Sequence, residues 1–164
     1  MDEELANLVA ARWPRLVRAA VLLGSSRSEA EDLVQGVFER CVQKWSRVRQ
    51  AEDRDAYVHR MLVNALVSSR RRRWTDEVPS ATLTPESGAD ATLEIDDADV
   101  MERALKGLSP DHRAVVVLRY YALLSEQQMA TVLGVAPGTV KSRLARALQV
   151  LAADPRLNHL RGTP

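Results

Sequence analysis

Apolar side chains recur every three or four residues along most of this chain, and that spacing restricts the fold to helices. The pattern runs from Leu5 to Arg73 and resumes from Ala98 to Leu151. Such spacing places one apolar stripe along an α-helix, whereas a half-buried strand needs alternation at every second position. Aromatic residues, which sheets favour, make up only 4% of the chain. The sequence therefore predicts an all-α protein.

Between the two helical stretches the periodicity is lost. Residues 76–102 contain nine acidic residues and no lysine or arginine, while the blocks on either side are basic. Prolines, a glycine and several hydroxyl residues accompany the acids, which is typical of a flexible segment. We predict two small helical domains, at residues 1–74 and 98–164, joined by a flexible acidic linker at residues 75–97. The linker reaches on the order of 70 Å when extended and about 25 Å when relaxed, so the domains can sit apart.

The sequence carries no pattern for catalysis, metal binding or membrane insertion. The three histidines lie far apart, and the acids Glu29, Glu31 and Asp32 have no histidine, nucleophile or metal partner at a suitable spacing. Cys41 falls inside a helical pattern and is interpreted as a small buried apolar side chain. The start is acidic, and the longest apolar runs are far shorter than the roughly 18 residues of a membrane span. We expect a cytoplasmic protein with no catalytic residue, metal, cofactor or direct membrane binding.

The C-terminal block contains the start and stop signals of a helix-turn-helix. Ser125 and Gln128 form a capping box that begins one helix, and Gly134 ends that helix as a left-handed cap. Pro137 suits the first position of the next helix, because the N–H that proline lacks would have no helical partner there. The second domain is therefore predicted to contain a helix-turn-helix.

The second helix of this unit combines an apolar stripe with a basic face. The stripe expected to pack inward consists of Val140, Leu144, Leu148 and Leu151. On the outward face Lys141 and Arg143 can meet phosphates, and Arg146 can fork to a guanine edge. The residues predicted to contact DNA are Thr139, Lys141, Ser142, Arg143 and Arg146. The alternative is an ordinary helical hairpin with a solvated basic face.

A second candidate nucleic-acid surface ends the N-terminal block. A helix that starts near Asp55 carries an aromatic ring, an amide and a run of four arginines. Binding of an unpaired base requires an aromatic ring on which the base can stack and polar groups that form hydrogen bonds with the edge of the base. The candidate residues are Tyr57, Arg60, Asn64, Arg70, Arg71, Arg72 and Arg73. Arginines at a helix C-terminus are also favoured by the macrodipole, and Tyr57 can instead pack in a core, so both interpretations stay open.

A third patch lies on residues 29–45. One face carries apolar residues, and the side chains Asp32, Gln35, Glu39 and Arg40 point elsewhere. Mixed charge of this kind is usually just solvated, but it can also dock a partner protein.

Together these segments resemble bacterial sigma factors of the extracytoplasmic-function (ECF) group, which keep only conserved regions two and four. Residues 30–45 resemble the region-two helix that binds the clamp helices of the largest polymerase subunit. Residues 55–73 resemble the segment that recognises and melts the minus-ten element. Residues 108–148 resemble region four, which reads the minus-thirty-five element with its helix-turn-helix.

The resemblance implies a non-enzymatic, dissociable subunit that directs core RNA polymerase to specific promoters and helps to melt the minus-ten element. Asp32, Gln35 and Glu39 would face the clamp, and Asn64 with the loop from Val48 to Arg54 would hold a flipped non-template base. Further partners implied are the flap of the second-largest subunit and promoter DNA, duplex and single-stranded. An anti-sigma factor is another candidate partner, which the sequence does not identify.

Two positions depart from the family pattern. Gly36 stands where the family commonly has an acidic residue, and Ala136 replaces the customary capping residue before the recognition helix. The alternative function is a stand-alone helix-turn-helix regulator that binds operator DNA. That alternative leaves the clamp-like segment and the arginine run without a role.

Overall fold

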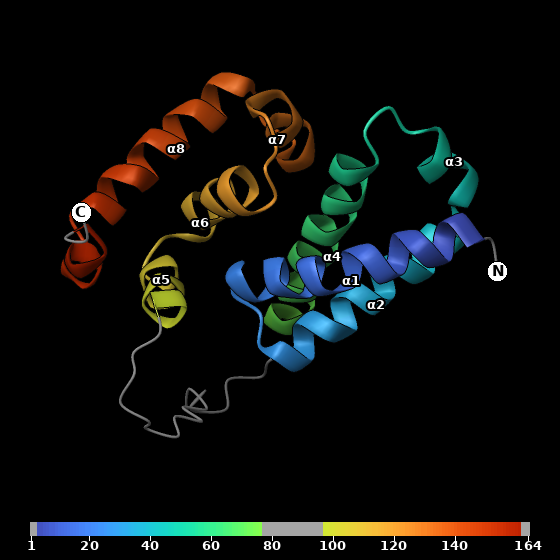
Figure 1. Cartoon of the computed structure of the whole chain (residues 1–164), viewed down its shortest axis with the longest axis horizontal. Coiled ribbons are helices and arrows are strands. Elements are labelled where there is room, and N and C mark those ends of the chain that lie inside the picture. Colours follow the sequence, from blue (N-terminus) through green and yellow to red (C-terminus); the bar gives the residue numbers. More distant parts are fainter. Residues whose placement is uncertain (1–2, 77–96, 162–164) are drawn as a thin grey trace.

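The structure, a computed structural model, describes residues 3–76 and 97–161, and every regular element in those ranges is helical (Figure 1). The all-α prediction is thus confirmed for the described chain. The predicted linker at residues 75–97 lies almost wholly outside the described residues. No helix within the two described ranges has both the length and the apolar character that a bilayer crossing requires.

The N-terminal half is a bundle in which α1 packs on α2 and α2 packs on α4. Its elements are α1 (Glu3–Leu22), α2 (Arg27–Gln43), α3 (Trp45–Gln50) and α4 (Arg54–Asp76). Val34, Val58 and Leu62 are fully buried between these helices. Cys41 is also fully buried, and its thiol lies 3.7 Å from the sulfur of Met61. This burial confirms the interpretation of Cys41 as a small core side chain, and it raises the pKa of the thiol.

The C-terminal half is built around α6 and α8, which pack on each other, with α7 beside them. Its elements are α5 (Asp97–Lys106), α6 (Pro110–Val116), the π-helical turn η1 (Val117–Tyr121), α7 (Glu126–Leu133), α8 (Pro137–Ala152) and the 3-10 helix η2 (Pro155–Arg161). The fully buried side chains Val115, Leu118 and Met129 form the centre of this half.

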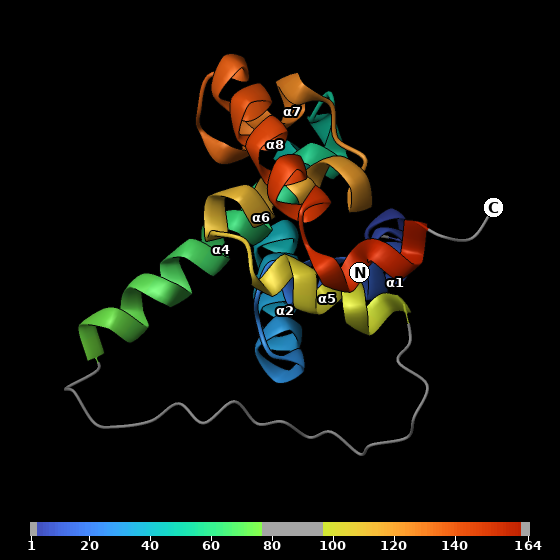
Figure 2. The ribbon, with the colours of Figure 1, turned by 90° about the vertical axis from the view of Figure 1, so that its left-hand side faces the viewer.

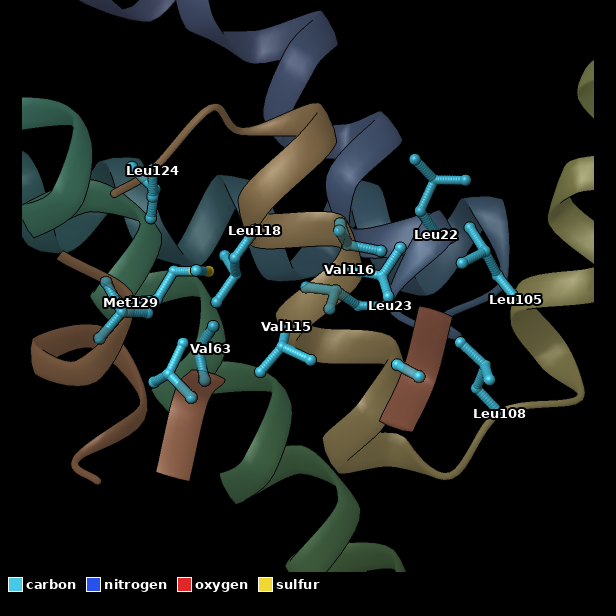
Figure 3. Close-up of a cluster of buried hydrophobic side chains, with 14 of the residues drawn as sticks. Leu22, Leu23, Val63, Leu105, Leu108, Val115, Val116, Leu118, Leu124 and Met129 are labelled. Atoms are coloured by element: carbon cyan, nitrogen blue, oxygen red, sulfur yellow. The ribbon is translucent and has the colours of Figure 1, made fainter. Parts of the chain in front are cut away.

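The two halves also pack against each other, with α4 beside α7 (Figures 1 and 2). One apolar cluster contains Leu23 and Val63 from the N-terminal half and Val115 and Met129 from the C-terminal half (Figure 3). The sequence allows the two domains to sit apart, whereas in this structure they share a core.

Candidate nucleic-acid interface

The predicted helix-turn-helix is present in α7 and α8. The hydroxyl of Ser125 accepts a hydrogen bond from the Gln128 N–H at 3.1 Å, and the Gln128 side chain accepts one from the Ser125 N–H at 2.6 Å. Gly134 ends α7 with φ at 66°, in the left-handed region that glycine tolerates best. Pro137 is the first residue of α8. Local capping signals therefore position the second helix, as the sequence predicts.

The start of α8 lacks a side-chain cap. Ala136 occupies the N-cap position with φ at −67° and ψ at 148°, and no side chain accepts a hydrogen bond from the first turn. Ser26, which caps α2, has nearly the same backbone angles, and its hydroxyl accepts a bond from the third helical residue. The backbone at position 136 is thus already arranged for a capping serine.

Ala136→Ser should raise the free energy of unfolding by about 1 kcal/mol, because its hydroxyl can accept a hydrogen bond from an unpaired N–H of the first turn. Urea denaturation followed by circular dichroism would measure the gain. Ala136→Val is the matched control, since it adds atoms without an acceptor and should give no such gain. Equal stability of the serine and valine variants would show that this end of α8 does not need a cap.

The face of α8 away from the core presents three of the five predicted DNA-contacting residues to solvent. Lys141, Ser142 and Arg146 are exposed, while Thr139 and Arg143 are half-buried. Ser142 and Arg146 are one helical turn apart and share a face. The Ser142 hydroxyl donates to the carbonyl of Thr139 at 3.1 Å, so its acceptor lone pairs stay available to a base or a phosphate.

Arg143 is held within the protein. Its guanidinium pairs with the Asp111 carboxylate on α6 at 3.4 Å, and its side chain is 28% exposed. A phosphate contact by Arg143 stays a prediction, and a phosphate there would share the guanidinium with the Asp111 carboxylate. The ion pair between Arg143 and Asp111 links α8 to α6.

The inward stripe of α8 is shorter than the sequence predicts. Val140 is fully buried, and Leu144 and Leu151 are half-buried against the core. Leu148 is 38% exposed, so its predicted burial is wrong. α6 has seven residues and α8 has 16, so the shorter helix cannot cover the whole length of the longer one.

The predicted base-binding residues of α4 lie beside the contact with the C-terminal half. Arg60 and Asn64 are exposed, and Tyr57 is half-buried. Tyr57 and Arg60 line a groove of 640 Å³ together with residues 51–53 of the preceding loop. Asn64 is not among the residues that line this groove. The structure thus brings Tyr57, Arg60 and part of the predicted loop together and leaves Asn64 on the open surface.

Three of the four arginines of the predicted basic run are exposed, namely Arg71, Arg72 and Arg73, and Arg70 is half-buried. Arg70 donates to the carbonyl oxygen of Leu23 at 2.6 Å, and Arg73 pairs with the Glu29 carboxylate at 2.6 Å. Arg70 and Arg73 thus have partners within the protein, although Arg73, like Arg71 and Arg72, is open to solvent.

Each half of the chain matches a protein-family model. The family model for Sigma-70 region 2 matches residues 8–75, and the model for Sigma-70 region 4 matches residues 98–151. The RNA polymerase sigma-E factor of Streptomyces coelicolor is 35% identical over 151 residues, covering 92% of this chain and 85% of that protein. The chain belongs to the ECF sigma factors.

Another curated relative of this ECF sigma factor is the ECF RNA polymerase sigma factor SigL of Mycobacterium tuberculosis, which is 36% identical. That match covers 83% of this chain and 80% of SigL. Among solved structures, a chain of the co-crystal structure of the sigma factor RpoE with the anti-sigma factor NepR from Bartonella quintana matches at a TM-score of 0.75. It covers 99% of both chains at 24% identity, which supports the fold.

In this ECF sigma factor, α2 exposes the side chains predicted to face polymerase. Asp32, Gln35, Glu39 and Arg40 are all exposed and recur at helical spacing along one side of α2. The Gln35 amide donates to the Glu39 carboxylate at 3.2 Å. A Cβ at Gly36, in the middle of this face, would meet no other atom within 4 Å. The glycine therefore leaves a gap in the face and lowers helix stability by up to about 1 kcal/mol relative to alanine.

The sequence interpretation did not include the capping box that begins α2. The Ser26 N–H donates to the Glu29 carboxylate at 2.8 Å, and the Ser26 hydroxyl accepts from the Glu29 N–H. The Ser-x-x-Glu spacing was the available signal. The bond from the Ser26 backbone, together with the nearby charge of Arg73, lowers the pKa of Glu29 below its usual value. The start of α2 and the basic end of α4 are thus joined through one carboxylate.

Proposed function

We propose that this sigma factor attaches RNA polymerase to promoters at two points on the DNA. In this proposal the C-terminal domain, residues 98–164, holds the duplex minus-thirty-five element through α8. The N-terminal domain, residues 1–74, captures unpaired bases of the minus-ten element through α4. The observation that supports the division is the presence of two separate exposed polar faces, one with Asn64 and Arg60 and one with Lys141, Ser142 and Arg146.

The chain directs RNA polymerase to promoters, as an ECF sigma factor. Capture of unstacked bases stabilises the melted state, because that binding free energy is gained only after the strands separate. Each face alone binds weakly, and polymerase supplies the geometry that makes the second contact intramolecular. The protein acts as a non-enzymatic specificity subunit in the cytoplasm. The α2 face of Asp32, Gln35, Glu39 and Arg40 would meet the polymerase clamp.

An anti-sigma factor belongs among the proposed partners. RpoE of the structural match was crystallised with the anti-sigma factor NepR. A second match, CnrH with the cytosolic domain of CnrY, has a TM-score of 0.62 at 21% identity and covers 93% of this chain and 88% of that chain.

The test is run-off transcription with purified core RNA polymerase on a pool of genomic promoter fragments, with and without this protein. We expect transcripts that start only when the protein is present. These starts should vanish when Asn64→Ala and Arg146→Ala are combined. The matched control combines Asn7→Ala and Arg103→Ala, which remove the same residue types from exposed positions on α1 and α5 and should leave the starts unchanged.

A folded protein that shifts duplex DNA, yet neither associates with polymerase nor creates new starts, would overturn the proposal. It would leave a stand-alone operator-binding regulator as the better account.

A further inference from the structure

A small basic cavity lies where α1 crosses α4 and contacts η1 (Figure 1). Its volume is 190 Å³, which is below the roughly 300–1,000 Å³ of pockets that hold drug-sized ligands. Its titratable side chains are Arg12 and Arg15 of α1, Asp55 and His59 of α4, and Tyr121 of η1. None of these five residues belongs to the surfaces proposed to bind promoter DNA or polymerase. We call this site the α1–α4 cavity.

The two arginines of the cavity differ in their partners. Arg12 and Arg15 are three residues apart and therefore share one face of α1. The Arg12 guanidinium pairs with the Asp55 carboxylate at 2.5 Å. Arg15 is exposed, and within residues 3–76 and 97–161 no carboxylate forms an ion pair with it. One of the two positive charges is therefore balanced within the protein, and the other is not.

The backbone of Arg12 and Arg15 is held by the core. Leu16 follows Arg12 by one helical turn and is only 1% exposed. It packs in the N-terminal cluster together with Val58, which precedes His59 on α4. Buried neighbours on both helices thus fix the positions from which the polar side chains enter the cavity.

A backbone hydrogen bond sets the tautomer of His59. Its Nδ1 lies 2.7 Å from the carbonyl oxygen of Asp55, and a carbonyl only accepts, so Nδ1 carries a proton. Nε2 is then the ring nitrogen left for a ligand, and it donates only when the ring is cationic. Burial lowers the pKa of His59, and the charges of Arg12 and Arg15 lower it further. The hydrogen bond to Asp55 and the charge of its carboxylate act in the opposite direction.

The charge of the cavity selects an anion. Two guanidinium groups against one carboxylate leave positive charge in excess, and that carboxylate is 55% exposed and already paired. Arginine presents paired N–H donors that match two oxygens of a phosphate or sulfate. A negative charge in the cavity also favours the cationic form of His59, whose Nε2 then becomes a further donor. The volume and the donors together suit a small oxyanion.

We propose that the α1–α4 cavity binds a small phosphate-type oxyanion, held by Arg12, Arg15 and the Nε2 of protonated His59. Inorganic phosphate and the phosphate group of a small monoester share this chemistry. The inference does not depend on the proposed contacts with promoter DNA, because it uses other residues and its test does not measure transcription.

The first experiment follows the imidazole signals of the full chain by NMR while sodium sulfate is added, with ionic strength kept constant by sodium chloride. Sulfate keeps its charge over the range of about pH 5–8 in which histidine titrates, so any proton uptake belongs to the protein. Bound sulfate should raise the pKa of His59 by about one unit or more. His112 of α6 lies outside the cavity and should not respond, which makes it the internal control.

The same linkage predicts how sulfate affinity varies with pH. Because the anion raises the pKa of His59, binding takes up a proton, and the affinity should rise roughly tenfold as the pH falls through the free and bound pKa values. His59→Asn keeps a donor in the position of Nδ1 and removes Nε2, so it should abolish this pH dependence. A pH dependence that survives in His59→Asn would show that another group takes up the proton, and it would remove His59 from the site.

Arg15→Gln tests the guanidinium that has no partner. It should weaken sulfate binding by about tenfold or more without loss of helicity, because Arg15 is exposed and makes no contact that the fold requires. Arg47→Gln is the matched control, since it removes an exposed arginine from α3, away from the cavity. Equal effects of the two variants, or a His59 shift that sodium chloride alone reproduces, would identify an ordinary solvated basic surface and overturn the proposal.

The source of the oxyanion is tested by competition. Inorganic phosphate and phenyl phosphate should each displace sulfate and shift His59 in the same direction. A short DNA duplex at equal phosphate concentration should have no such effect. If the duplex shifts His59 and the two small phosphates do not, the cavity is a contact for the DNA backbone, and the small-anion proposal is wrong.

Discussion

Arg113→Met should lower the free energy of unfolding by about 3 kcal/mol, because it leaves several partly buried carbonyl groups without a hydrogen-bond donor. The Arg113 guanidinium donates to the carbonyl oxygens of Leu105 at 2.9 Å, Lys106 at 3.1 Å and Leu108 at 3.1 Å. Methionine keeps an unbranched chain of similar length and removes the guanidinium with its donors and its charge. One side chain thus supplies hydrogen-bond donors to the carbonyl groups at the end of α5 and in the turn into α6.

Urea denaturation followed by far-UV circular dichroism measures this loss. Lys106→Met is the matched control, because its exposed amine pairs with the half-buried Glu102 carboxylate at 3.3 Å, one helical turn away. Such pairs contribute about 0.5 kcal/mol or less. Equal losses for Arg113→Met and Lys106→Met would contradict a capping role for Arg113.

Arg146→Ala should raise the dissociation constant for the minus-thirty-five element by about tenfold or more, because a bidentate contact with guanine contributes about 1–3 kcal/mol. The loss of affinity should depend on the DNA sequence. Replacing the G·C pair that Arg146 reads should weaken binding by the wild type strongly and binding by the variant only slightly. Binding is measured at one fixed salt concentration against the element and its single-base-pair variants.

Lys141→Ala is the comparison for a phosphate contact. Lys141 is exposed on the same helix and carries the same charge as Arg146. Its loss should weaken binding to all sequences alike and reduce the slope of log K against log salt by about one. If Arg146→Ala also weakened all sequences equally, Arg146 would be a second phosphate contact and the base-reading role would be wrong.

Features encoded by neighbouring residues could be predicted from the sequence. The helix-turn-helix depended on Ser125, Gln128, Gly134 and Pro137, each of which acts within one turn of its own position. Such signals need no knowledge of the rest of the fold. The burial of Cys41 likewise follows from its place on an apolar stripe.

Features that depend on which helix lies opposite could not be predicted in the same way. Leu148 continues the apolar stripe of α8 and is exposed, because burial also needs a neighbouring helix long enough to cover it. Arg143 was assigned to phosphate, and its pairing with Asp111 depends on how α6 packs against α8. The spacing of residues along one helix carries no information about either contact.

The sequence of α4 contains an indication of the contact between the halves, but its periodicity does not identify the partner. α4 carries apolar residues on more than one face: Val58 and Leu62 pack in the N-terminal bundle, whereas Val63 packs with the C-terminal core. A helix that is apolar on two faces predicts a second partner. Its sequence does not say whether that partner is another protein or the other half of the same chain.

The side-chain amide of Gln128 makes two hydrogen bonds, one within the capping box of α7 and one to Asp53 at the start of α4. A substitution at this position would remove both. Gln127 and Thr131 line the same groove, and the Thr131 hydroxyl donates to the carbonyl of Gln127 within α7. A substitution at position 128 would therefore alter the start of α7 and its contact with the start of α4 together.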